Sequence, residues 1–99
     1  MNIKNLFSIE GQTAVITGGT GVLGSVMAKG LAEAGARVVV LGRRKQAGED
    51  LVNSIRGKGK EIFFIEADVL EVSALEKANA IILEKYGTID ILINPAGGN

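Results

Sequence analysis

The chain has 99 residues, which is enough for one small domain. Eleven basic and eleven acidic residues cancel, so no surplus of positive charge indicates a nucleic-acid partner. The absence of cysteine and histidine excludes disulfides and thiolate chemistry, removes the commonest general base and metal ligand, and leaves no metal site to predict. No apolar run approaches the roughly 20 residues of a membrane-spanning helix, and the start lacks a signal-peptide apolar region. We therefore expect a cytoplasmic protein that binds neither membrane nor nucleic acid.

Short apolar segments alternate along the chain with segments of helical periodicity. The apolar runs expected to form buried strands are residues 13–17, 38–41, 61–67 and 89–93. The stripes expected to face them from three intervening helices are Leu23, Met27 and Leu31, then Ala47, Leu51 and Ile55, then Leu75, Ala78, Ile82 and Tyr86. Ser73 and Glu76 have the spacing of a capping box that would open the third helix.

Four strands separated by three helices predict an α/β fold with a parallel sheet and right-handed crossovers. We expect a doubly wound sheet of Rossmann type, truncated after the fourth strand. In the strand order 3-2-1-4 the fourth strand lies at an edge of this sheet.

A glycine-rich loop follows the first strand and precedes the first helix. Residues 19–24 read Gly-Thr-Gly-Val-Leu-Gly, a G-x-G-x-x-G pattern that allows a tight turn, close approach of a pyrophosphate and close helix packing. The helix N-terminus adds free N–H groups and a positive dipole end. A glycine-rich surface turn is the alternative, but the strand–loop–helix setting favours nucleotide binding. The candidate binding residues are Gly18, Gly19, Thr20, Gly21, Val22, Leu23 and Gly24.

The end of the second strand carries Gly42, Arg43 and Arg44. In a Rossmann fold this position lies beside the adenosine ribose, where an acidic residue would favour NAD. A small residue followed by two guanidinium groups instead leaves room for a 2′-phosphate and offers it bidentate donors. The alternative is a solvated basic start to the second helix, continued by Lys45. We favour NADP over NAD as the cofactor.

Three ordered motifs resemble those of the short-chain dehydrogenases/reductases. Residues 17–24 resemble the family's first-strand signature, and Asp68-Val69 resembles its adenine contact after the third strand. Residues 89–97 resemble its fourth-strand motif, in which Asn94, Ala96 and Gly97 are candidate cofactor contacts. The similarity covers the whole chain but only the front part of a typical member. Residues 1–99 are therefore expected to be an NAD(P)-binding half-domain.

The sequence departs from the family pattern at two positions. Val22 replaces the middle glycine of the short members' loop, and Gly21 takes over one place earlier. That arrangement is usual in extended members and also occurs in a sugar-acid-directed branch of the short ones, so both subgroups stay open. Pro95 stands where Asn or Ala is common, which removes a backbone N–H and favours an extended Asn94.

The resemblance implies NAD(P)-dependent interconversion of carbonyl and alcohol by a Tyr-Lys pair assisted by Ser and Asn. None of these catalytic residues can be carried over, because they are expected beyond Asn99 and the only tyrosine, Tyr86, lies on an inward stripe. The implied partners are a nicotinamide dinucleotide, a small carbonyl or alcohol substrate and, in a complete protein, further copies in a homo-oligomer.

The substrate and the status of the chain each leave alternatives. The run Gly97-Gly98-Asn99 hints at sugar acids such as mannonate or fructuronate, but not more strongly than at an oxoacyl or other alcohol substrate. A non-catalytic nucleotide-binding remnant or partial gene product is the alternative to a fragment of an oxidoreductase.

Overall fold

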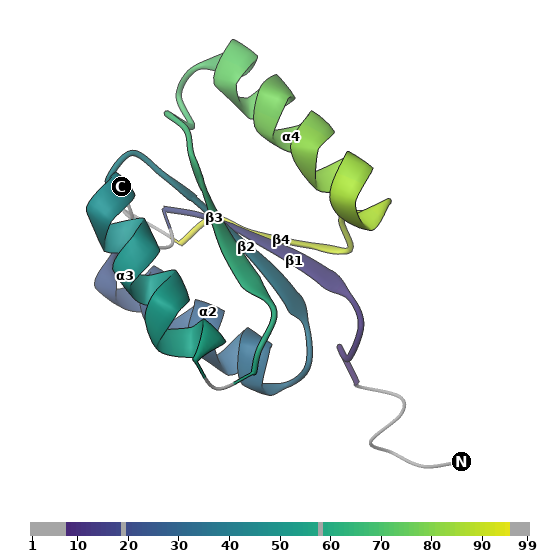
Figure 1. Ribbon diagram of the computed structural model, residues 1–99. Helices are drawn as coiled ribbons and strands as arrows, with labels where there is room; N and C mark the ends of the chain where they lie inside the picture. The colour runs from purple at the N-terminus through teal and green to yellow at the C-terminus, as the bar shows by residue number, and fades with distance from the viewer. Residues whose placement is uncertain (1–7, 19, 58, 96–99) are drawn as a thin grey trace.

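The computed structural model describes residues 8–18, 20–57 and 59–95. Figure 1 shows a sheet with helices packed on both of its faces. The elements in chain order are β1 (Thr13–Thr17), α2 (Val22–Glu33), β2 (Arg37–Gly42), α3 (Lys45–Arg56), β3 (Ile62–Glu66), α4 (Val72–Tyr86) and β4 (Ile91–Ile93). No helix in the described residues is long and apolar enough to span a membrane.

The four strands form one parallel sheet in the order β3-β2-β1-β4. Helices α2 and α3 cover one face and α4 covers the other (Figure 1). Both the predicted fold class, an α/β doubly wound sheet of Rossmann type, and the predicted strand order are confirmed. Strands β3 and β4 are each shorter than predicted, because the chain at 61, 67, 89 and 90 lies outside the ladders.

The two faces of the sheet form two separate core clusters, because successive side chains of a strand point to opposite sides. On the α2–α3 side, Ile16, Val38 and Val40 pack with buried alanines of α2. On the α4 side, Val15, Val39 and Leu41 pack with Ala78 and Ile82. The central strands are therefore covered on both faces, as their continuous apolar runs predict.

The predicted apolar stripe of α2 is displaced by one residue. The buried residues are Gly24, Ala28 and Ala32, whereas Leu23 is 54% exposed. Met27 and Leu31 are half-buried beside the core. Small residues bring a helix backbone close to the sheet, so the contact face follows the small side chains and the larger ones flank it.

The predicted capping box of α4 is wrong, whereas its inward stripe is confirmed. The helix begins at Val72, so Ser73 lies inside its first turn, and Glu71 at the N-cap makes no side-chain cap bond. Two turn bonds precede the helix instead: Asp68 Oδ1 accepts from the Leu70 N–H (3.0 Å), and its carbonyl accepts from the Glu71 N–H (3.0 Å).

Candidate functional site

The carboxyl ends of the four parallel strands lie at the same end of the sheet, where the residues that follow them line two neighbouring cavities. The first, of about 300 Å³, is lined by Gly18, Gly42, Arg43, Ala67, Asp68, Val69, Leu70 and Asn94. The second, of about 450 Å³, is lined by Gly18, Thr20, Gly42, Arg43 and Arg44. Each strand end thus contributes sequence-predicted residues to one place, at the edge where open α/β sheets bind ligands.

The glycine-rich loop is held against the end of β2. Gly18 has a φ of +70°, a conformation that favours glycine, and its N–H donates to the Leu41 carbonyl (2.8 Å). The Gly21 N–H donates back to the Gly18 carbonyl (3.3 Å), and Gly21 is the extended N-cap of α2. The first turn of α2 therefore opens at this loop, where its N–H groups have no intrahelical acceptors and can bind an anion.

The remaining predicted loop residues differ in exposure. Gly24 is buried, Thr20 is half-buried, and Val22 and Leu23 expose apolar side chains on the first turn of α2. Gly19 lies outside the described residues. The arrangement has a tight turn and a closely packed helix start, which are two of the three functions assigned to the glycines of this motif.

Gly42 is buried where β2 meets the loop. A Cβ at this position would lie 3.5 Å from Thr20 Oγ1 and 3.5 Å from Phe64 Cε1, which is ordinary contact. Arg43 and Arg44 follow with exposed side chains. Among the described residues that line the second cavity, two are arginines and none is a carboxylate, so its electrostatic character is positive.

The segment after β3 is tied to the end of β2, because the Ala67 N–H donates to the Gly42 carbonyl (2.9 Å). Asp68 and Val69 follow, both half-buried and both lining the first cavity. The carboxylate of Asp68 is oriented by the Leu70 N–H. The first cavity is therefore lined by one carboxylate and one aliphatic side chain from this segment, in addition to Gly18.

Directly after β4, the Asn94 side chain links the carboxyl ends of β1 and β4. The Thr17 hydroxyl donates to Asn94 Oδ1 (2.7 Å) and lies 3.5 Å from the Ile93 carbonyl oxygen. Pro95 is buried directly after it. Ala96 and Gly97, the other predicted contacts of this motif, lie outside the described residues.

Sequence reasoning missed Thr17, Ala67 and Leu70 as site residues. Thr17 belongs to the quoted first-strand signature, and the strand order brings its hydroxyl to Asn94. Leu70 is 84% exposed yet lines the cavity, and only its position after Asp68-Val69 could have indicated this.

Tyr86 lies far from this site, at the end of the sheet where the strands begin and where α4 ends. Its ring packs near Phe63 with a centroid separation of 5.9 Å and lies beneath the Arg37 guanidinium, 4.7 Å from the ring centroid. Burial raises the pKa of the Tyr86 phenol, and the nearby Glu61 carboxylate raises that pKa further. The prediction that this tyrosine packs inward is confirmed. In the part of the chain that the structure describes, no cluster of potential ligands could hold a metal ion.

Comparison with known proteins identifies the family. Residues 12–99 match the short chain dehydrogenase family, so the chain belongs to this family of oxidoreductases. An uncharacterized oxidoreductase, UxuB of Bacillus subtilis, is 46% identical over 92 residues, which cover 93% of this chain and 33% of that protein. A second, YgcW of Escherichia coli, is 38% identical over 94% of this chain and 35% of its own length.

Solved structures agree with the fold. Hydroxysteroid dehydrogenase from Escherichia coli has a TM-score of 0.86 and 32% identity, covering 95% of this chain and 39% of that one. An actinorhodin polyketide ketoreductase variant with NADPH has a TM-score of 0.81 and 32% identity, covering 86% of this chain and 33% of that one. The chain thus spans about a third of the length of the curated relatives it matches.

Proposed function

We propose that residues 1–99 are the nicotinamide dinucleotide-binding half of a short-chain dehydrogenase/reductase, and that this site prefers NADP(H) to NAD(H). The observation that carries the proposal is the positive cavity at the end of β2, lined by Gly18, Thr20, Gly42, Arg43 and Arg44. It adjoins the glycine-rich loop, so a pyrophosphate at the loop and a ribose 2′-phosphate at the arginines can belong to one ligand.

The loop residues fit a pyrophosphate. Gly18 is in a left-handed conformation and Gly21 leaves the start of α2 open, so an anion can approach backbone N–H groups at close range. The adenine would lie against Asp68 and Val69 in the first cavity. Asn94, with Ala96 and Gly97, would meet the nicotinamide ribose, and Thr17 would fix the orientation of the Asn94 amide.

The NADP preference rests on charge and space at the end of β2. An acidic residue here would accept hydrogen bonds from the ribose hydroxyls of NAD, but this chain has Gly42. Arg43 supplies a planar donor set suited to phosphate. Two structural relatives support this reading: the ketoreductase was solved with NADPH and a metagenomic short-chain oxidoreductase in complex with NADP.

For the whole protein we propose carbonyl–alcohol interconversion, with hydride exchanged between the bound nicotinamide and a small-molecule substrate. The names of the relatives include a 2,4-dienoyl-CoA reductase and a hydroxysteroid dehydrogenase, which share the family but not the substrate. The substrate class therefore depends on residues other than the cofactor site. Homo-oligomerisation and a cytoplasmic location remain predictions.

Calorimetric titration of NADPH and NADH against the chain and its Arg43→Ala variant tests the cofactor preference. A charge-assisted hydrogen bond to phosphate contributes about 1.5–3 kcal/mol, so Arg43→Ala should weaken NADPH binding by roughly 10–150-fold and leave NADH nearly unchanged. Lys45→Ala is the matched control, because Lys45 is an exposed cation two residues later that lines a different cavity. Equal NADPH affinities for wild type and Arg43→Ala would contradict the assignment.

A further inference from the structure

The Phe64 ring packs against Gly48 at one end of the connection that carries the two arginines, and it lies near Gly42 at the other end. A Cβ built on Gly48, in the first turn of α3, would overlap Phe64 Cδ1 and Cε1 and lie 2.5 Å from Cγ. A Cβ built on Gly42, at the end of β2, would lie 3.5 Å from the same Cε1 atom. The ring therefore leaves no room for a side chain at Gly48, whereas at Gly42 it leaves room for a Cβ.

The connection between the two glycines is anchored at its far end by backbone bonding. Arg44 is the N-cap of α3, in an extended conformation, and its carbonyl accepts from the Gly48 N–H (3.0 Å). A displacement of Gly48 therefore moves Arg44 directly and Arg43 through the chain. At the near end, the Gly42 carbonyl accepts from the Ala67 N–H (2.9 Å), which ties the end of β2 to the segment after β3.

We propose that the close contact between Gly48 and the Phe64 ring positions Arg43 and so sets the preference for a 2′-phosphorylated nucleotide. The inference rests on the proposed function and adds two positioning residues, neither of which touches the ligand. Bidentate bonding to phosphate needs the guanidinium held in one orientation, and the ring packed against Gly48, together with the backbone bonds at both ends of this short connection, supplies that rigidity.

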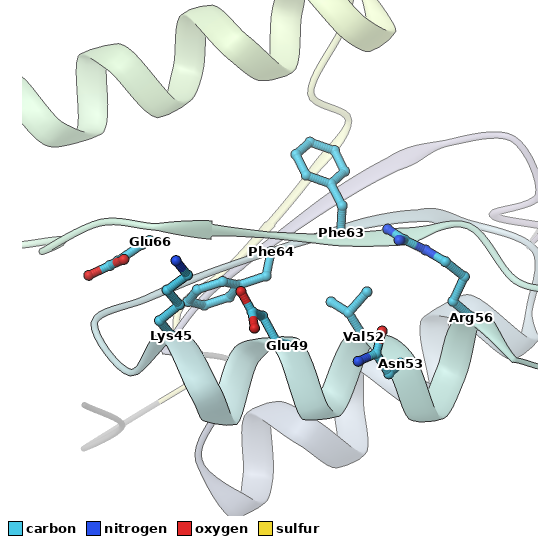
Figure 2. Close-up of a pocket in the computed structure, with 8 residues that line it drawn as sticks. All are labelled: Lys45, Glu49, Val52, Asn53, Arg56, Phe63, Phe64 and Glu66. Carbon is cyan, nitrogen blue, oxygen red and sulfur yellow. The ribbon is translucent and has the colours of Figure 1, made fainter.

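A cavity beside Phe64 makes the contact testable, because it gives the ring somewhere to move. Figure 2 shows Phe63 and Phe64 leaving β3 on opposite sides, with Phe64 directed toward α3 near Lys45 and Glu49. The cavity has a volume of about 410 Å³ and lies between β3 and α3. A methyl group at Gly48 can therefore push the ring toward this space and shift the start of α3, which carries Arg44 and with it Arg43.

Adenosine 2′,5′-bisphosphate and adenosine 5′-monophosphate are the probes, since they differ only in the 2′-phosphate. Their dissociation constants are measured by calorimetry for wild type, Gly48→Ala, Phe64→Leu and the double variant. Gly48→Ala should reduce the affinity ratio between the two nucleotides by roughly three- to tenfold, because the charge-assisted bonds lose their geometry. Phe64→Leu should reduce the ratio in the same direction. The double variant, in which the overlap is relieved, should recover part of the preference lost in Gly48→Ala.

Gly30→Ala is the control, because Gly30 is also a helical glycine but a Cβ there meets nothing within 4 Å. It should leave the affinity ratio unchanged. A purely structural role for Gly48 would lower both affinities together, and an unchanged ratio in Gly48→Ala would overturn the inference. If Gly48→Ala does not fold, an unchanged affinity ratio in Phe64→Leu overturns the inference. A wild type that does not discriminate between the nucleotides would instead overturn the proposed function itself.

Discussion

Gly42 is the residue at which cofactor preference can be reversed with least disturbance of the fold. A Cβ fits there at ordinary contact distance from Thr20 and Phe64, so the first carbon of a side chain does not have to displace the loop. Gly42→Asp should favour NADH, because the carboxylate repels a 2′-phosphate and accepts hydrogen bonds from the free ribose hydroxyls. We expect NADPH affinity to fall by about tenfold or more and NADH affinity to rise, measured by fluorescence titration at one salt concentration.

Gly42→Ala separates charge from bulk in that experiment. It adds the same Cβ without the carboxylate, so the preference for NADPH should survive. A loss of NADPH binding as large in Gly42→Ala as in Gly42→Asp would show that space, and not charge, governs the position.

At the residue scale, the sequence was most informative about the parts of the candidate site that depend on backbone conformation, because glycine motifs reflect that requirement directly. Gly18, Thr20 and the Gly42–Arg43 pair line one cavity, as the strand–loop–helix motif leads one to expect. The bond from Thr17 to Asn94 was not predicted, because it depends on the register that pairs Ile16 with Ile93 across 77 residues of chain. The contact between Phe64 and Gly48 was not predicted either, because apolar periodicity does not indicate how closely a helix approaches a strand.

At the element scale, apolar periodicity located the helices and strands of the described residues, but not which side of α2, or of the first two turns of α3, faces the sheet. Leu23, Met27 and Leu31 form the larger stripe, yet close approach to the sheet selects the small residues one position later. The Ser73–Glu76 spacing satisfied a capping rule, but the turn bonds of Asp68 set the start of α4 at Val72. Local patterns thus predict that an element exists, and tertiary contacts set its rotation and its ends.

Two glycines on helices should respond oppositely to the same substitution. Gly87 ends α4 in a left-handed conformation with a φ of +79°, so Gly87→Ala should destabilise the fold by about 1–2 kcal/mol. Gly30 lies on the exposed side of α2 with open space around a Cβ, so Gly30→Ala should stabilise it by about 0.5–1 kcal/mol. Urea unfolding at one protein concentration measures both, and a shift of the same sign for the two variants would contradict this account.

At the scale of the whole molecule, the edge formed by β4 is the least covered part of the sheet. Leu92 is 69% exposed beside an apolar cavity of about 530 Å³, whose lining includes Val15, Leu75 and Ile82. An uncovered edge strand offers unpaired N–H and C=O groups to another chain. We therefore expect the 99-residue chain to self-associate through β4.

Leu92→Lys should reduce that self-association, because a charge on an edge strand opposes edge-to-edge pairing. Ile81→Lys is the control. Ile81 is exposed like Leu92, but it lies on α4 and is not among the residues that line this cavity. Sedimentation velocity measures both variants. A monomeric wild type with a sharp, cooperative thermal transition would refute the expectation.

The most direct test of the dinucleotide site is amide NMR of the ¹⁵N-labelled chain during titration with NADP⁺. Glycine amides report on both ends of the sheet. Gly18, Gly21 and Gly42 lie at the carboxyl ends of the strands. Gly35, Gly59 and Gly87 each precede a strand and so lie at the opposite end. We predict saturable shifts of the Gly18, Gly21 and Gly42 signals, with the Gly35, Gly59 and Gly87 signals unchanged. Shifts confined to the opposite end, or no saturable shift of the Gly18 and Gly42 signals, would contradict this prediction.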